Sequence, residues 1–215
     1  MDIIQKLTEE LQVKRGQVEA AVKLIDEGNT IPFISRYRKE ATGALNDEQL
    51  RNLDERLTYL RNLEEKKAQV ISSIEEQGKL TDELKKAIEA AQTQVAVDDL
   101  YRPYRPKRRT RAIIAKEKGL EGLENVILLQ RTSQPLEEEA KNYLSEEKGV
   151  STAEEAIAGA MDIIAESISD EADYRTWIRN KTMKEGMITS EAKDDQAQSV
   201  YETYYHFCQP LNKMA

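Results

Sequence analysis

The sequence predicts a mostly α-helical protein. Apolar residues recur at intervals of three and four along most of the chain, which places them on one face of an α-helix. Nine Gly and five Pro among 215 residues are too few for a loop-rich β protein or a disordered chain. With 33% charged and 39% hydrophobic residues, the composition is typical of a helix-rich cytoplasmic protein. The length allows one domain or two small ones.

The composition also excludes several classes of protein. No apolar run approaches the ~20 residues that cross a bilayer, and the first ten residues lack the basic and apolar stretches of a secretory signal. We therefore expect no contact with a membrane. The single cysteine, Cys208, cannot form an internal disulfide, and it cannot build a structural zinc site with the single histidine, His206.

Residues 1–45 predict two short helices with the outline of a helix-turn-helix. Apolar residues at helical spacing indicate an amphipathic helix over residues 2–12. A second helix follows and ends at Gly28, because glycine suits the left-handed position at a helix end. Pro32 favours extended geometry in the residue before it. Residues 30–35 are therefore predicted to form an extended connector.

Residues 46–118 predict a long helical hairpin followed by a basic segment. Asn46 can cap the first helix, with Gln49 at the reciprocal position of a capping box. The apolar spacing supports about 30 helical residues, or ~45 Å, until Gly78 ends the helix. Thr81 can cap the second helix, whose apolar face matches the first. An antiparallel hairpin is the simplest arrangement of the two.

Residues 119–185 predict a second helical bundle. Its main helix begins at a capping box, which we assign to Ser151-Thr152-Ala153-Glu154. The residues of this helix that are predicted to face inward are Ala156, Ile157, Ala160, Met161, Ile163, Ile164 and Ile168. Residues 183–192, with Gly186 in the middle, predict a small β-hairpin, which opens the last segment of the chain, residues 186–215. An aromatic segment follows, which we expect to lead into a further domain.

The charge of the chain is unevenly distributed. The formal net charge is −8, yet residues 101–118 contain eight Lys and Arg and a single acidic residue. Pro103 and Pro106 predict that this basic segment is extended and exposed. A cluster of this density repels itself unless an anion or solvent surrounds it. The candidate phosphate-binding residues are Arg102, Arg105, Lys107, Arg108, Arg109 and Arg111, with Tyr101 and Tyr104 available to stack on bases.

The basic segment is also compatible with two roles that involve no nucleic acid. The arginines could pair with the chain's own surplus of carboxylates and hold helices together, since matching of surface charge is common. They could also bind an acidic protein partner. The exposure of the side chains separates these possibilities, because guanidinium groups that lie within pairing distance of Asp or Glu weaken the phosphate hypothesis.

No catalytic motif is recognisable, so we expect no enzyme activity, no cofactor and no metal site. The chain lacks a Gly-rich phosphate loop and a Ser elbow. His206 and Cys208 would point to different faces of a helix. Asp98 and Asp99 are adjacent, but a two-metal site needs carboxylates from several elements. We expect one of these aspartates to cap a helix or to pair with an arginine.

Two long motifs carry a family resemblance. Residues 31–43 read IPFISRYRKEATG, and residues 99–112 read DLYRPYRPKRRTRA. Together, and in this order, they resemble the N-terminal region of the bacterial Tex family of transcription accessory proteins. The resemblance covers essentially the whole chain, and it implies a helical scaffold that precedes an RNase-H-like domain, helix-hairpin-helix elements and an RNA-binding OB-fold.

The resemblance also implies partners. It implies RNA or DNA, bound through the phosphate backbone, together with the transcription machinery and the remaining domains of a longer chain. Contacts from the basic segment would contribute affinity rather than sequence specificity. Arg36, Arg38 and Lys39, within the first motif, are second-choice contributors to nucleic-acid binding.

Overall fold

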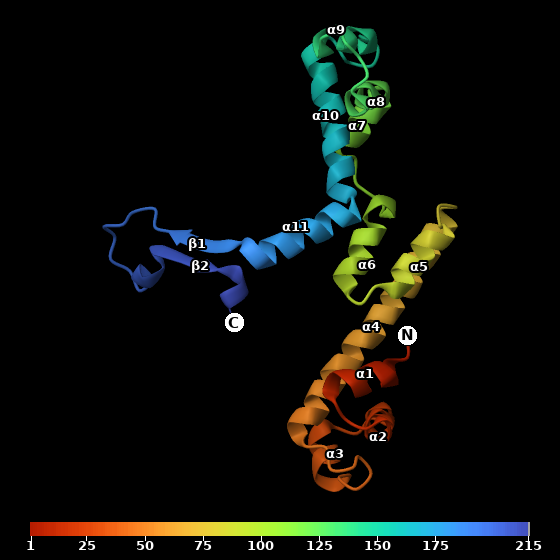
Figure 1. Cartoon of the computed structure of the whole chain (residues 1–215), viewed down its shortest axis with the longest axis vertical. Coiled ribbons are helices and arrows are strands. Elements are labelled where there is room, and N and C mark those ends of the chain that lie inside the picture. Colours follow the sequence, from red (N-terminus) through yellow and green to blue (C-terminus); the bar gives the residue numbers. More distant parts are fainter. Residues whose placement is uncertain (215) are drawn as a thin grey trace. The chain divides into compact units, whose positions relative to one another are not determined.

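The computed structural model describes residues 1–214 and confirms a mostly α-helical fold. These residues form eleven α-helices, short 3-10 turns and one two-stranded antiparallel sheet (Figure 1). The chain divides into two compact units, residues 1–101 and 102–215. Each unit contains a separate cluster of buried apolar side chains, and we describe each by itself.

In the first unit, three short helices pack against the beginning of a long one (Figure 1). They are α1 (Ile3–Leu11), α2 (Arg15–Asp26) and α3 (Ile31–Tyr37), and the long helix is α4 (Asp47–Glu76). Leucines at the predicted spacing on α4 are buried and meet Leu7, Val18 and Ile34 from the short helices. Gly28 follows α2 with φ +83°, the left-handed conformation predicted for it.

The prediction of an extended connector over residues 30–35 is wrong. These residues lead into α3, where Pro32 is the second helical residue. The first amides of a helix have no acceptor within the helix, so proline's missing N–H costs nothing there, and its fixed φ suits the helix. Ile34 is fully buried against the first core. Packing of Ile34 against the other helices therefore also stabilises α3, and this tertiary contact cannot be predicted from the local sequence.

The long helix follows its local signals closely. Asn46 accepts a hydrogen bond from the Gln49 amide at 2.8 Å, and the Gln49 side chain accepts one from the Asn46 amide at 3.0 Å. The helix runs for 30 residues, as predicted. Gly78 lies just beyond its end with φ +66°. Capping and apolar spacing are therefore sufficient to define this element.

The second limb of the hairpin is broken into two helices, α5 (Asp82–Ala90) and α6 (Gln94–Tyr101). Thr81 caps α5 as predicted. Lys67 of α4 is only 4% exposed, and its ammonium donates to the carbonyl oxygen of Glu89 at 2.9 Å. A cation is favourable against the last carbonyls of a helix, and the same ammonium also pairs with Glu64 of α4 at 2.8 Å. The buried charge of Lys67 is therefore satisfied by both partners.

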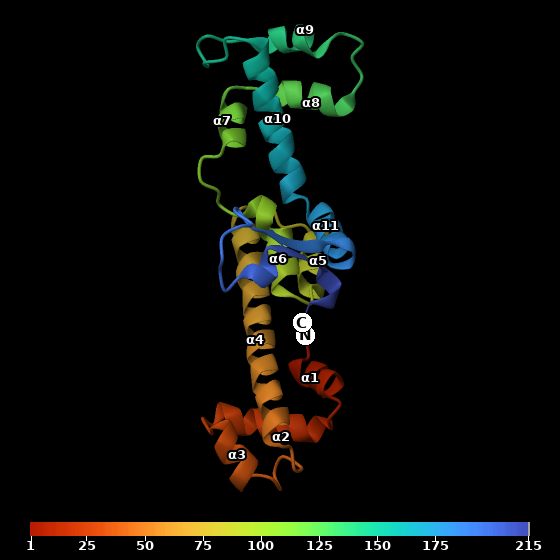
Figure 2. The same cartoon turned by 90° about the vertical axis from the view of Figure 1, so that its left-hand side faces the viewer.

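In the second unit, three short helices pack along α10 (Ala153–Asp170) (Figure 2). They are α7 (Arg111–Glu117), α8 (Glu121–Leu129) and α9 (Leu136–Ala140). Leu123 and Ile163 are among the fully buried side chains of this second core. The sequence pattern did not predict α7. Thr110 caps it by accepting a hydrogen bond from the Ile113 amide at 3.1 Å.

Two details predicted for α10 are wrong. Its N-cap is Thr152 rather than Ser151, and Glu155 rather than Glu154 bonds back to the amide of Ser151. The Thr152 side chain accepts a hydrogen bond from the Glu155 amide at 3.2 Å, whereas the Glu155 carboxylate accepts from the residue before the N-cap, so the reciprocal bond of a capping box is not formed. Met161 and Ile168 are exposed. The second core packs against the face of α10 that carries Ala156, Ala160 and Ile163, and neither residue belongs to that core.

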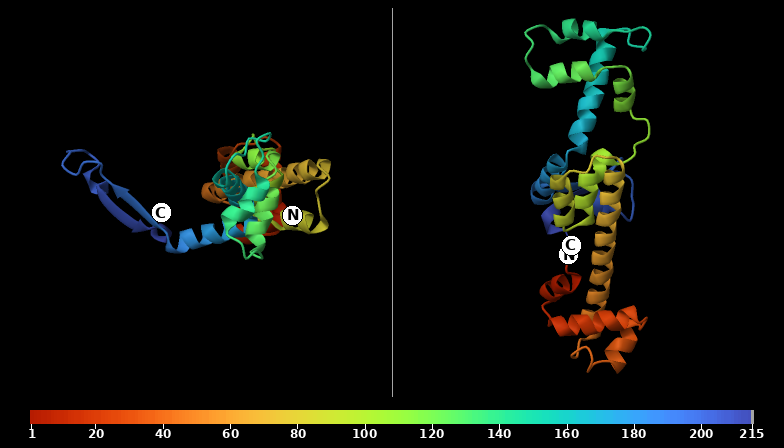
Figure 3. Two further views of the ribbon diagram at one scale, coloured as in Figure 1. Left: turned by 90° about the horizontal axis from the view of Figure 1, so that it is seen from above. Right: turned by 90° about the vertical axis from the view of Figure 1, so that its right-hand side faces the viewer.

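The β-hairpin exists, but its strands differ from the prediction. α11 (Ala172–Glu185) continues to the residue before Gly186, and β1 (Met187–Glu191) pairs with β2 (His206–Pro210) (Figure 3). The register runs from Met187 opposite Pro210 to Glu191 opposite His206. The second strand begins in the aromatic segment, which local spacing near Gly186 could not indicate. No helix within residues 1–214 has both the length and the apolar character that crossing a membrane requires.

Candidate nucleic-acid interface

The basic segment leaves α6 through a turn rather than an extended path. Residues Arg102–Tyr104 form a 3-10 turn that contains Pro103, so the prediction of extended backbone is wrong for these residues. Residues 106–110 have no regular structure, and Arg111 is the first residue of α7. Proline tolerates the first turn of a helix. Pro103 is therefore compatible with the 3-10 turn that follows α6, and the backbone does not become extended at this proline.

The two tyrosines are less available for stacking than the sequence suggested. Tyr101 belongs to α6, and its hydroxyl lies 3.0 Å from the Ser73 hydroxyl of α4 in a hydrogen bond. Tyr104 is half-buried, as is Tyr101. A side chain that is partly buried and hydrogen-bonded within the protein presents little open ring to a base.

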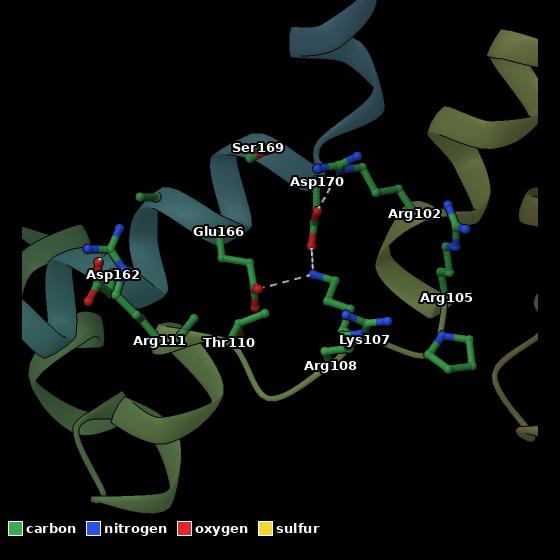
Figure 4. Close-up of a pocket in the computed structure, with 13 residues that line it drawn as sticks. Arg102, Arg105, Lys107, Arg108, Thr110, Arg111, Asp162, Glu166, Ser169 and Asp170 are labelled. Carbon is green, nitrogen blue, oxygen red and sulfur yellow. Dashed lines mark hydrogen bonds and ion pairs between the residues drawn. The ribbon is translucent and has the colours of Figure 1, made fainter.

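An acidic face on α10 lies opposite the basic segment. Asp162, Glu166 and Asp170 follow one another at intervals of four residues, so they share one side of the helix. With the basic residues they line an open pocket of about 650 Å³ (Figure 4). The sequence reasoning missed these three carboxylates, although their i, i+4 spacing was a usable signal.

Two cations of the segment are fixed to the end of this acidic face. The Nε of Arg102 lies 3.0 Å from one carboxylate oxygen of Asp170, and the ammonium of Lys107 contacts the other. The same ammonium lies 3.5 Å from Glu166 (Figure 4). The Asp170 side chain is only 13% exposed. Water competes less for partly buried partners than for exposed ones, so these contacts anchor the segment.

Two further arginines have exposed ion pairs. Arg109 lies 2.6 Å from Glu117, and Arg111 lies 3.6 Å from Asp162. The Arg111 side chain is 86% exposed. Exposed pairs contribute little free energy and are screened by salt. A phosphate group could displace either carboxylate at small cost.

The remaining two of the six basic candidates are Arg105 and Arg108. Both are exposed, and neither has an ion-pair partner among the residues that the structure describes. Four of the six basic candidates therefore pair with carboxylates and two do not. Internal pairing accounts for most of the segment. The cations left for the phosphate hypothesis are the two unpaired arginines and, after them, Arg109 and Arg111, whose ion pairs are exposed.

The second-choice cations lie in the first unit, at and after the end of α3. Arg36, Arg38 and Lys39 are all exposed. Within residues 1–214 none of them contacts a carboxylate, but the Arg38 guanidinium lies 5.3 Å from the centre of the Phe33 ring. These residues are thus less occupied by internal ion pairs than those of the basic segment.

The remaining candidate chemistry is structural. Asp98 pairs with Lys66 at 2.6 Å rather than with an arginine, and Asp99 is buried. His206 and Cys208 lie two residues apart in β2, so they share a face of the strand, whereas in a helix they would point to different faces. No group of three His, Cys, Asp or Glu side chains suited to a metal ion occurs in the described part of the chain.

Comparison with known proteins agrees with the resemblance. Residues 1–75 match a family model described as the Tex-like protein N-terminal domain. Residues 130–215 match one described as Tex central region-like.

Several relatives align along nearly the whole chain. It is 45% identical to the transcriptional accessory protein Tex of Neisseria gonorrhoeae over 217 residues, which covers 100% of this chain and 28% of the relative. It is 44% identical to the protein YhgF of Escherichia coli over 206 residues, 94% of this chain and 26% of the relative. The human S1 RNA-binding domain-containing protein 1 is 28% identical over 216 residues, 96% of this chain and 21% of that protein. The chain thus spans less than a third of the length of these relatives.

Proposed function

The chain belongs to the Tex family, and on that premise we propose that it is a helical scaffold of a transcription accessory protein whose basic segment contacts the phosphate backbone of a nucleic acid. The contacts come first from Arg105 and Arg108, and then from Arg109 and Arg111. They contribute affinity rather than sequence recognition, because phosphates carry no base identity. The chain acts by binding, not by catalysis.

The observation that carries the proposal is the state of Arg105 and Arg108. Both line the pocket of Figure 4 and are exposed. Each lacks a carboxylate partner in residues 1–214, although acidic side chains surround the segment. A guanidinium presents a planar fork of donors that matches two phosphate oxygens.

The paired cations have a different role in this proposal. Arg102 and Lys107 hold the segment against the end of α10 through Asp170. Holding the backbone in place lowers the entropy that binding would otherwise cost. The names of the relatives support a nucleic-acid partner in general, since one is a transcriptional accessory protein and another an S1 RNA-binding domain-containing protein.

A second candidate function is a purely structural or protein-interaction module. The pairing of Arg102, Lys107 and Arg111 with the acidic face of α10 favours it. In that case the segment packs against α10 within the second unit, and its partner is a protein or another part of a longer chain. The two functions predict different effects of removing Arg105 and Arg108 on nucleic-acid binding.

The test is a titration of the full 215-residue chain with single-stranded RNA and with duplex DNA. Because each lost phosphate contact weakens binding, we expect Arg105→Gln/Arg108→Gln to lower affinity by about tenfold or more at ~50 mM salt. Its melting temperature should stay unchanged. The matched control is Lys85→Gln/Lys86→Gln, which removes two exposed charges from α5 and should bind as the wild type does.

The opposite pattern would favour the structural module. It would consist of equal nucleic-acid binding by wild type, Arg105→Gln/Arg108→Gln and the α5 control, together with a lower melting temperature for Arg102→Gln/Lys107→Gln alone. Absence of any binding at low salt would also contradict the phosphate proposal.

A further inference from the structure

We propose a second binding site, in the first unit, for single-stranded nucleic acid. It is formed by five residues at and just beyond the end of α3, which we call the α3 surface: Phe33, Arg36, Tyr37, Arg38 and Lys39. Tyr37 stacks on an unpaired base, and the cations contact the neighbouring phosphates. This site is separate from the basic segment and does not depend on the function proposed for it.

The aromatic part of the α3 surface is exposed yet supported. Tyr37 is 66% exposed, so its ring is not a core side chain. The Phe33 ring lies beside it, with 5.3 Å between the ring centroids and a tilt of 46°. Arg38 in turn covers Phe33 at 5.3 Å. Tyr37 is therefore held from one side, while its remaining surface is open to a base.

The charged part of the surface is free of competing carboxylates. Arg36 and Lys39 have no ion pair or hydrogen bond from their side chains within residues 1–214, and Arg38 donates only to the Tyr37 carbonyl at 3.4 Å. Glu40 is the only acidic residue between positions 31 and 45, and it forms no ion pair with them. In contrast to the basic segment, these cations can bind an external anion without displacing a carboxylate of the chain.

The backbone that carries the cations is fixed in one conformation. Thr42 is fully buried, and its hydroxyl donates to the Arg38 carbonyl at 3.2 Å. The Ala44 amide donates to the Lys39 carbonyl at 2.7 Å. From α2, the Gln17 side chain donates to the Gly43 carbonyl at 2.8 Å. A loop that is ordered before binding loses little entropy on binding, which distinguishes this surface from a mobile basic tail.

An exposed aromatic ring beside unpaired cations indicates which class of ligand the α3 surface binds. Stacking on an aromatic side chain needs a base whose face is open, which a single strand offers and a duplex does not. Positive side chains beside the ring follow the backbone of such a strand. An acidic peptide would use the cations but would gain little from an exposed tyrosine ring, so we argue for the nucleic acid.

The experiment uses the full chain and a labelled oligouridylate of roughly 12 nucleotides, a length that matches typical single-strand sites. We expect Tyr37→Ala to weaken binding about tenfold, since stacking contributes a factor of roughly 5 to 150 per base. Tyr37→Phe, which keeps the ring, should bind within about twofold of wild type. Melting temperatures verify folding, and Tyr37 is exposed enough for both variants to fold.

The salt dependence of binding tests the cations of the α3 surface. Arg36→Gln/Lys39→Gln should make the dependence of log affinity on log salt shallower by about 1.4, because each single-strand phosphate contact contributes ~0.7. Tyr37→Ala should leave that slope unchanged. Arg105→Gln/Arg108→Gln, in the second unit, tests the basic segment in the same assay. Loss of binding in that variant alone overturns the α3 site and leaves the basic segment as proposed.

Further results would also overturn the α3 site. Binding of Tyr37→Ala equal to wild type removes the stacking role. Equal losses for oligouridylate and for duplex DNA in Tyr37→Ala remove the preference for single strands. Binding of a short poly-glutamate peptide that competes fully with the oligouridylate, and that Tyr37→Ala does not weaken, assigns the surface to an acidic protein instead.

Discussion

Asp170 receives two cations at the end of α10, from Arg102 and Lys107. Because it is only 13% exposed, losing its charge leaves the Lys107 ammonium half-buried with a weaker partner in Glu166. We predict that Asp170→Asn destabilises the second unit by about 1–3 kcal/mol, as for a partly buried hydrogen-bonded charge. Urea denaturation measures the change in free energy of unfolding.

Asp162→Asn is the control for this comparison. Its carboxylate faces Arg111 at 3.6 Å, and the Arg111 side chain is almost fully exposed. Exposed pairs are worth about 0–1 kcal/mol, so this variant should unfold nearly as the wild type does. Equal losses in the two variants would contradict the anchoring role given to Asp170.

Two ion pairs in the first unit make its stability depend on pH. Hydrogen bonds from the Arg56 guanidinium hold the pKa of Glu10 below its ordinary value, and those from Arg61 do the same for the pKa of Asp26. A carboxylate with a lowered pKa in the folded state stabilises that state above its unfolded pKa, and the stabilisation is lost as pH falls through the folded pKa.

We therefore predict that the free energy of unfolding is nearly constant from about pH 7 to 5 and falls below about pH 4.5, where unfolded carboxyl groups begin to take up protons. Denaturation at a series of pH values measures this. Glu10→Gln should reduce the acid-dependent fall. A variant whose stability still falls as steeply as the wild type would show that Glu10 does not contribute.

At the scale of elements, Gly159 determines how closely α10 approaches its neighbours. A Cβ at this position would clash with Leu120, which is buried, and would lie 3.3 Å from the Cβ of Ala115 in α7. We predict that Gly159→Ala destabilises the protein by about 1–2 kcal/mol, because overpacking outweighs the better helix propensity of alanine. Gly16, in α2, has open space around the same position.

Gly16→Ala is thus the matched control, and it should be neutral or stabilising by up to about 1 kcal/mol. Thermal denaturation of the two variants distinguishes a packing effect from a propensity effect. A stabilised Gly159→Ala protein would contradict the close approach of α10 to Leu120.

The elements also show what sequence can predict and why. The boundaries of α4 follow from Asn46, Gln49 and Gly78, whose effects are local. In α3, Ile34 is buried against the first core, and at the end of α5 the Glu89 carbonyl accepts a hydrogen bond from Lys67 of α4. These contacts are made between elements. The spacing of apolar residues within one element does not contain them.

At the scale of the whole molecule, two hydrophobic cores stabilise two units. We predict that Leu53→Ala, in the first core, speeds amide hydrogen exchange in α1, α2 and α4. Leu123→Ala should do so in α7, α8 and α10. Each truncation should cost about 2–5 kcal/mol in its own unit. Equal acceleration in both units by either variant would contradict independent cores.

The net charge of −8 describes neither of the two proposed binding surfaces. Local composition defines the basic segment, but the acidic face opposite it comes from Asp162, Glu166 and Asp170, more than fifty residues further along the chain. Which cations are free is therefore a property of the fold. The sequence ranked the basic segment above Arg36, Arg38 and Lys39, although the segment is the more heavily paired of the two.

The slope of log affinity against log salt concentration tests the central claim most directly, for the full chain and for Arg105→Gln/Arg108→Gln bound to one RNA. If both arginines contact phosphates, the variant's slope should be shallower by about 1.4, because each single-strand contact releases about 0.7 of a counterion. Identical slopes for the two proteins would contradict the claim.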